Sequence, residues 1–145
     1  RLFEANVSFI SDHVKILMEH ELIKSKGRVV IISSIWELLT RQDKFAYTVT
    51  KAAVGGLVRS LAVDLGSAKG ILVNGILPGI VDTPMSRGLL KPEQIDAVIN
   101  GTPTGRMLIP SDIGNAVYLL ASELNTAISG QSLLVDNGWS IARKI

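Results

Sequence analysis

A tyrosine and a lysine stand four residues apart, at Tyr47 and Lys51, near the start of a predicted helix. Residues at i and i+4 of a helix lie on one face, about one turn apart. A free tyrosine has a pKa of about 10 and is a poor base at neutral pH, but a neighbouring cation favours its phenolate form. The pair therefore predicts a tyrosine that exchanges a proton with a substrate, beside a lysine that supplies the cation.

A serine ends the predicted strand before this helix. Ser34 lies thirteen residues before Tyr47, and its hydroxyl can donate a hydrogen bond to a substrate oxygen on which charge develops. Ser33 offers a second hydroxyl, although the spacing to Tyr47 favours Ser34. The pair of Tyr47 and Lys51 alone is a modest signal, and it gains weight because one buried strand precedes it and another follows it.

Strand-like runs alternate with helical patterns along the chain, which is typical of α/β proteins. The predicted helices cover residues 3–24, 44–65, 92–99 and 110–124. The predicted strands cover residues 28–34, 71–76 and 132–135. The first strand is apolar on both faces, as in a parallel sheet, and Gly66 is the expected end of the second helix. Such sheets bind ligands beyond the carboxyl ends of their strands, where Ser34 and Pro78-Gly79 fall.

Length and composition fit one globular domain, which we expect to cover residues 1–145. Of these residues 47% are hydrophobic and 19% are charged, which suits a buried core. The net charge of +2 comes from scattered Lys and Arg, so we predict no nucleic-acid partner. No apolar run reaches the ~18 residues of a membrane span, and the first residues do not resemble a signal peptide, so we expect no membrane partner and a cytoplasmic location.

We predict no metal site. The chain has no cysteine, which excludes disulfides, thiolate nucleophiles and cysteine-based metal sites. His13 and His20 lie seven residues apart without acidic residues at ligand spacing, as in most surface histidines. We expect Trp139 in packing or at an interface, with contact to an active site across a subunit boundary as the less favoured alternative.

Several motifs in a fixed order, between Asn6 and Trp139, resemble the short-chain dehydrogenase/reductase family. Ser34 matches the family's strand-ending serine, and Tyr47 with Lys51 matches its Tyr-x-x-x-Lys. Residues 73–83 are similar to the family's segment beside the nicotinamide, and residues 130–138 to its last strand and turn. Asn6 stands where the family's helical asparagine falls, and it fits a solvated or capping residue equally well.

The resemblance implies an α/β, Rossmann-like doubly wound parallel sheet, here incomplete, with about three parallel strands flanked by helices. It also implies an NAD(P)-dependent oxidoreductase that transfers a hydride between the nicotinamide and an alcohol or carbonyl substrate. The implied catalytic residues are Asn6, Ser34, Tyr47 and Lys51. The implied cofactor-binding residues are Tyr47, Lys51, Pro78, Gly79, Ile80 and Thr83. The cofactor is NAD or NADP, and no residue distinguishes the two.

Each implied role is specific. Tyr47 exchanges the alcohol proton, Ser34 positions the oxygen, and Lys51 favours the phenolate while contacting the nicotinamide ribose. Asn6 holds a water in a proton relay, while Ile80 and Thr83 meet the nicotinamide carboxamide.

The implied substrate pocket includes Ser34, Trp36, Glu37 and Met85. Relatives have small residues and glycine after the serine, so Trp36 and Glu37 should crowd or acidify the pocket. Residues 82–106 should form a lid over the substrate. The helices at 3–24 and 44–65 resemble those of the family's dimer interface, which implies a homo-oligomer; the alternative is that their apolar faces cover the sheet.

The chain resembles the carboxyl-terminal part of such an enzyme, because no Thr-Gly-x-x-x-Gly-x-Gly turn is present. We therefore expect an exposed strand edge at residues 29–32, no stable monomer and little activity of the chain alone. One alternative function is a non-catalytic module or assembly subunit with the same fold. A flavodoxin-like phosphate binder is disfavoured by the lack of a glycine-rich phosphate loop.

Overall fold

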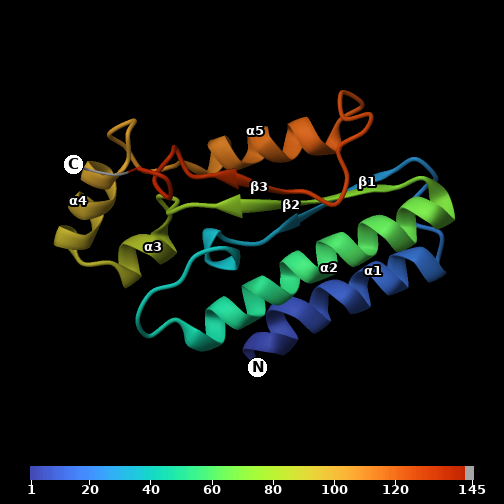
Figure 1. Ribbon diagram of the computed structural model, residues 1–145, viewed down its shortest axis with the longest axis horizontal. Coiled ribbons are helices and arrows are strands. Elements are labelled where there is room, and N and C mark those ends of the chain that lie inside the picture. The colour runs from blue at the N-terminus through green and yellow to red at the C-terminus, as the bar shows by residue number, and fades with distance from the viewer. Residues whose placement is uncertain (143–145) are drawn as a thin grey trace.

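The computed structural model describes residues 1–142 and contains a parallel sheet of three strands in the order β1-β2-β3 (Figure 1). The strands are β1 (Arg28–Ile32), β2 (Leu72–Pro78) and β3 (Ser132–Val135). The helices are η1 (Glu4–Ser8), α1 (Phe9–Glu19), η2 (Ile35–Glu37), α2 (Phe45–Lys69), α3 (Pro84–Leu89), α4 (Pro92–Gly101) and α5 (Pro110–Ala121). The predicted α/β class and parallel strands are confirmed.

Helices cover both faces of the sheet. In Figure 1, α1 and α2 lie along one face and α5 lies along the other. The core beneath α1 and α2 consists of Val14, Ile31, Val54, Val58, Leu65, Ile71 and Val73. On the opposite face, Ile76 packs against Ala116 and Leu120 of α5. β1 and β2 therefore pack apolar side chains on both faces, which explains the lack of polar alternation in β1.

The first helix is shorter than the predicted span 3–24. It begins as a single π-helical turn, η1, and α1 ends at Glu19. Glu21 has a left-handed φ of 55°, so the chain turns well before Gly27. Gly27 instead allows a close approach, because a Cβ there would lie 2.8 Å from the Lys24 carbonyl oxygen.

The second helix is longer than the predicted span 44–65, and Gly66 does not end it. The helix continues to Lys69, and Gly70 follows with a left-handed φ of 65°. The N–H of Gly70 donates to the carbonyl of Gly66 at 2.9 Å. The left-handed cap, and not the presence of a glycine, decides where the helix ends.

The strand boundaries differ from the predicted ones by a few residues. β1 ends at Ile32, although the N–H of Ser33 still donates to Ile76 at 2.8 Å. β2 begins and ends one to two residues later than predicted and includes Pro78. Pro78 is tolerated because β1 has already ended there, so no N–H is needed on that side. Residues 132–135 form β3 as predicted.

Segment 80–109 holds two helices, of which only α4 was predicted. α3, α4 and α5 each have a proline in the first turn, where its missing N–H costs nothing. The last helix ends at Ala121 and not at the predicted residue 124. Its first turn is capped by the Asp112 carboxylate, which accepts from the N–H of Ile109 at 2.9 Å.

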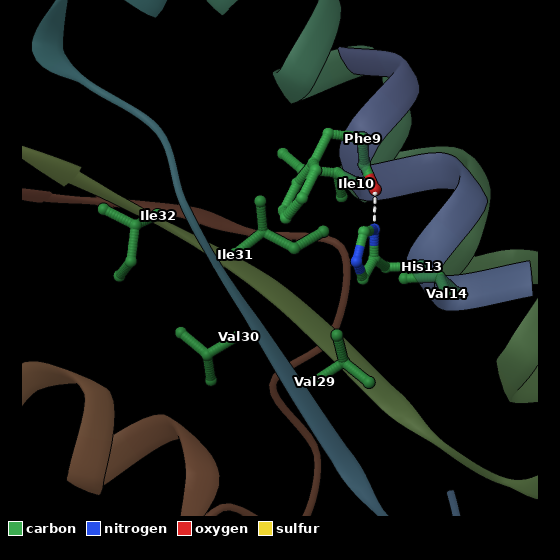
Figure 2. Close-up of a pocket in the computed structure, with 8 residues that line it drawn as sticks. All are labelled: Phe9, Ile10, His13, Val14, Val29, Val30, Ile31 and Ile32. Atoms are coloured by element: carbon green, nitrogen blue, oxygen red, sulfur yellow. Dashed lines mark hydrogen bonds between the residues drawn. The ribbon is translucent and has the colours of Figure 1, made fainter. Parts of the chain in front are cut away.

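Within residues 1–142, β1 pairs only with β2, so its other edge is unpaired. The expected exposure of residues 29–32 is only partly correct, because Ile31 is 6% exposed and Ile32 is 46% exposed. Figure 2 shows the groove of about 300 Å³ that remains between this edge and α1. In it, the Nδ1–H of His13 donates to the Phe9 carbonyl at 2.6 Å.

Candidate functional site

A cavity of about 700 Å³ lies beyond the carboxyl ends of β1 and β2. Five segments line it: the end of β1 with η2, the start of α2, the turn after β2, the helices α3 and α4, and Trp139. The structure thereby brings together most of the predicted site residues, namely Ser33, Ser34, Trp36, Tyr47, Pro78, Gly79, Ile80, Thr83 and Met85. The strand ends that sequence reasoning singled out therefore surround one cavity.

Tyr47 lies in the first turn of α2, and Lys51 follows one turn later on the same face. The Lys51 Nζ is 5.6 Å from the centroid of the Tyr47 ring. The Nζ of Lys44, just before the helix, is also 5.6 Å from this centroid. Two ammonium groups thus lie within cation–π distance of one aromatic ring.

Lys51 is buried, with 7% of its surface exposed. Burial lowers the pKa of Lys51 from its ordinary value, and the nearby Glu37 carboxylate opposes that shift. Glu37 lies on η2, and its side chain rests against α2 at Gly55. Its Oε2 is buried without a hydrogen-bond partner among the described residues.

Both candidate serines are buried and line the cavity. The Ser34 Oγ accepts a hydrogen bond from the N–H of Trp36 at 3.3 Å and so begins η2. Its own O–H remains available to donate. The Ser33 Oγ is buried and has no partner among the described residues, so both hydroxyls stay chemically possible donors.

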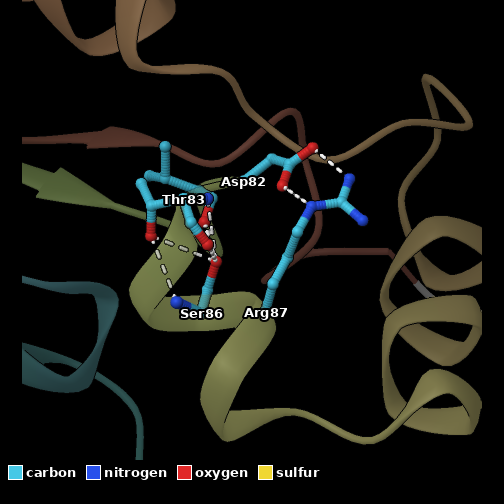
Figure 3. A network of polar contacts seen from close by, with 5 residues as sticks. Asp82, Thr83, Ser86 and Arg87 are labelled. Carbon is cyan, nitrogen blue, oxygen red and sulfur yellow. Dashed lines mark hydrogen bonds and ion pairs between the residues drawn. The ribbon is translucent and has the colours of Figure 1, made fainter.

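The Thr83 hydroxyl is held at the start of α3, after β2 (Figure 3). Its Oγ1 accepts from the N–H of Ser86 at 3.2 Å. The Ser86 hydroxyl in turn lies 2.6 Å from the carbonyl of Val81, to which it donates. The Thr83 Oγ1 also lies 3.2 Å from the Ser86 Oγ, to which it donates because the Ser86 proton goes to Val81. Thr83 therefore lines the cavity with a hydroxyl that Ser86 holds in place, and a lone pair of its oxygen remains for a ligand.

Next to this network, Arg87 pairs with Asp82 through two parallel hydrogen bonds (Figure 3). The guanidinium hydrogen bonds lower the pKa of the Asp82 carboxyl. Such a bidentate pair fixes both groups geometrically. It ties α3 to the segment that leaves β2, so the first turn of the predicted lid is held in place.

Three predicted residues do not line the cavity: Asn6, Glu37 and Lys51, of which Lys51 is buried behind Tyr47. Asn6 lies inside η1, and its Nδ2 donates to the carbonyl of Leu2 at 3.1 Å, a contact within its own helix. Glu37 does not line the cavity either, since its side chain rests on Gly55. The expected acidic pocket wall is therefore wrong: the 3-10 turn of η2 directs Trp36 into the cavity and Glu37 away from it.

Sequence reasoning missed two cationic lining residues, Arg41 and Lys44, which come from the segment before α2. No motif pointed to them, because they lie outside the regular elements, where spacing does not fix the direction of a side chain. Trp139, from the turn after β3, also lines the cavity. The rings of Trp36 and Trp139 meet edge to face with centroids 6.5 Å apart, so Trp139 contacts the site within its own chain and not across a subunit boundary.

Residues 1–142 contain no cluster of three His, Asp or Glu side chains placed to hold a metal ion. Over the same residues, no helix is both long enough and apolar enough to cross a bilayer.

Comparison with known proteins supports a single family. A family model described as enoyl-(acyl carrier protein) reductase matches residues 3–140. The 7alpha-hydroxysteroid dehydrogenase of Escherichia coli (strain K12) is 37% identical over 139 residues, which cover 95% of this chain and 54% of that protein. The chain thus spans about half the length of the curated relatives it matches.

Solved structures agree with this match. A short chain dehydrogenase family protein from Francisella tularensis superposes with a TM-score of 0.87 at 25% identity, covering 97% of this chain and 61% of that one. A 7 alpha-hydroxysteroid dehydrogenase complexed with NADH and 7-oxo glycochenodeoxycholic acid gives a TM-score of 0.72 at 37% identity, covering 77% and 44%. The chain, with its Rossmann-type sheet and its Tyr47–Lys51 cavity, belongs to the short-chain dehydrogenase/reductase family.

Proposed function

We propose that the protein is an NAD(P)-dependent oxidoreductase that transfers a hydride between a nicotinamide cofactor and an alcohol or carbonyl substrate. The single observation that carries this proposal is that Tyr47 and Ser34 line one cavity beyond the sheet, with the buried Lys51 ammonium 5.6 Å from the Tyr47 ring centroid. The relatives support it, since one of them is a hydroxysteroid dehydrogenase. Because the chain covers about half of that relative, the proposal concerns the whole protein.

Tyr47 is the proposed general acid and base. In the direction of carbonyl reduction, its hydroxyl gives a proton to the substrate oxygen, and in the reverse direction its phenolate accepts one. The Lys51 ammonium, 5.6 Å from the ring centroid, stabilises the negative charge on Tyr47. The buried position of Lys51 strengthens this effect because water screens it poorly there.

Ser34 is the proposed donor that orients the substrate oxygen. Its Oγ already accepts from the N–H of Trp36, so its position is fixed and its proton points elsewhere. A donor fixed before the reaction stabilises the oxygen as charge develops on it. Ser33 remains the alternative, because its buried Oγ also lacks a partner among residues 1–142.

The residues after β2 fit a nicotinamide group. Pro78, Gly79, Ile80 and the hydroxyl-bearing Thr83 line the cavity, and a carboxamide needs donors and acceptors such as peptide groups and a hydroxyl oxygen. When bound, the nicotinamide supplies the hydride chemistry. Lys51 would hold the adjoining ribose. NAD and NADP are both compatible with these residues.

Residues 82–106 are the proposed lid. Helices α3 and α4 contribute Met85, Ser86, Leu89, Leu90, Gln94, Ala97 and Val98 to the cavity wall. A lid of this kind excludes water from the reacting groups. Met85 and Trp36 are proposed substrate contacts, since both line the cavity.

We also propose self-association through the faces of α1 and α2. Several large apolar side chains of these helices are exposed, among them Phe9 at 57%, Phe45 at 82% and Val63 at 68%. Exposed apolar surface on this scale is typical of an interaction site. This supports the homo-oligomer that the family resemblance implies.

Steady-state reduction of a ketone panel with NADH and NADPH tests the function, with a Tyr47→Phe variant. We expect this variant to lose activity by a factor of about 10² or more, because the proton donor is removed. Tyr118→Phe is the matched control, since the other tyrosine of the chain is 66% exposed on α5. Equal activity of Tyr47→Phe and wild type would favour the non-catalytic module instead.

A further inference from the structure

We propose that the substrate carries an anionic group, a carboxylate or a phosphate, on an apolar skeleton, and that Arg41 and Lys44 bind this group. This inference rests on the proposed function, because it names the substrate class of the same cavity. It depends on three observations: where the two cations lie, which charges are absent from the wall, and what the rest of the wall is made of.

The two cations are held at the cavity by aromatic rings that also line it. The Arg41 guanidinium carbon lies 5.8 Å from the centroid of a Trp36 ring. The Lys44 Nζ lies 5.6 Å from the centroid of the Tyr47 ring. Cation–π contacts fix a side chain in place without neutralising its charge. Lys44 therefore stands beside the predicted proton donor and Arg41 beside Trp36, and both charges remain available to a ligand.

No acidic side chain balances these charges. The residues that line the cavity include no Asp or Glu, and neither Arg41 nor Lys44 forms an ion pair within residues 1–142. Asp82, close to the wall, is already paired with Arg87. Two uncompensated cations at a concave, partly apolar surface attract anions more strongly than the same charges on an open surface.

The rest of the wall is mainly apolar. Apolar side chains line much of the cavity of about 700 Å³, namely Met85, Leu89, Leu90, Val98 and Trp139. This volume suits a molecule of drug-like size. A small polyol would leave the apolar surface of these side chains in contact with water, whereas an aliphatic or alicyclic skeleton would bury it. The wall therefore selects an amphipathic molecule with one charged end.

The chain carries its own reporter for this cavity. Its only two tryptophans are Trp36 and Trp139, and both line the cavity. Tryptophan fluorescence therefore measures occupancy without turnover, so the result does not depend on hydride transfer.

The probes are 4-cyclohexyl-4-oxobutanoate and its neutral amide, which share one skeleton. We expect the carboxylate to bind about tenfold more tightly than the amide at low salt, since hydrogen bonds to charged groups outweigh neutral ones. The ratio should fall as salt rises. It should approach one in the Arg41→Gln/Lys44→Gln double variant.

Matched controls are Arg59→Gln and Lys24→Gln, which remove exposed cations away from the cavity and should keep the ratio. Each single variant, Arg41→Gln and Lys44→Gln, should show part of the loss, which covers the case of a double variant that does not fold. Equal binding of both probes to the wild type would overturn the inference, as would an unchanged ratio in the Arg41 and Lys44 variants.

Titration with NADPH and NADH distinguishes the other source of an anion, the cofactor phosphates. Weaker NADPH binding in the double variant, with an unchanged ratio for the two probes, would assign both cations to the cofactor and overturn the inference. A normal ratio with no ketone reduction would instead reject the proposed function and leave the anion site in place.

Discussion

Replacing Gly55 by alanine should change two quantities, the free energy of unfolding and the pKa of Lys51. Gly55 lies inside the helix beneath the Glu37 side chain. A Cβ at this position would stand 2.3 Å from the Glu37 Oε1, whereas ordinary contacts begin at 3.4 Å. The Glu37 carboxylate must therefore shift by about 1 Å or move away from α2. It is the end of a flexible side chain, so it can leave without moving the backbone.

The expected change in the free energy of unfolding follows from two opposing effects. Glycine in a helix interior costs about 0.5–1 kcal/mol relative to alanine, so the substitution favours the folded helix. The displaced carboxylate loses little, because its Oε2 is buried without a partner among residues 1–142 and gains water when it leaves. We expect Gly55→Ala to raise the free energy of unfolding by about 0.5–1 kcal/mol.

The same substitution should change the pKa of Lys51. Burial lowers the pKa of Lys51 and Glu37 opposes that shift, so removal of the carboxylate should lower the pKa of Lys51 further. Urea unfolding at a fixed protein concentration measures the first effect. Titration of the Lys51 Cε signal by NMR measures the second.

Gly56→Ala is the matched control, because a Cβ at Gly56 would meet nothing within 4 Å. It should stabilise the helix to a similar extent and leave Lys51 unchanged. The reasoning is refuted if Gly55→Ala lowers the free energy of unfolding by more than about 1 kcal/mol. It is also refuted if Gly55→Ala and Gly56→Ala give the same Lys51 titration.

Three further predictions concern the sheet end, one ion pair and association. Gly79→Ala should lower the free energy of unfolding by about 1–3 kcal/mol, seen as a lower urea midpoint, because its Cβ would lie 3.0 Å from the Asp136 Cα; an unchanged midpoint contradicts this. Hydrogen bonds from Arg106 and Ile109 lower the pKa of Asp112, so its stabilising effect is present above the unfolded pKa of about 4 and is lost as the pH falls. The wild type should therefore exceed Asp112→Asn in urea midpoint by more at pH 7 than at pH 3, and an equal difference at both pH values would be inconsistent with this. Sedimentation should show concentration-dependent association through α1 and α2, and a concentration-independent monomer would exclude it.

The three strands and most of the helices could be predicted from the sequence because short apolar runs alternate with helical patterns, and β1 is a β-branched run with no polar alternation. The ends of the helices were harder to predict from the sequence. Gly66 and Gly70 are both glycines near the end of α2, and only the backbone conformation at Gly70 identifies the cap. That conformation depends on how the following strand joins the sheet, which is a tertiary property.

The site was predictable where one motif fixes one side chain. Tyr47 and Lys51 share a helix face by their spacing alone, and the structure keeps them together. Glu37 was not predictable in this way, because successive side chains in a 3-10 turn point about 120° apart, and Gly55 leaves room for the Glu37 carboxylate. The cations Arg41 and Lys44 lie in a loop, where spacing carries little information about direction.

The central claim is that the cavity at Tyr47 and Lys51 binds a nicotinamide cofactor, and direct titration with NADH and NADPH tests it. Nicotinamide fluorescence reports binding, with Lys51→Ala as the test variant and Lys24→Ala, an exposed lysine away from the cavity, as the control. The account predicts saturable binding to the wild type and to Lys24→Ala that is lost in Lys51→Ala. Binding of equal strength to Lys51→Ala, or no saturable binding to the wild type, would contradict it.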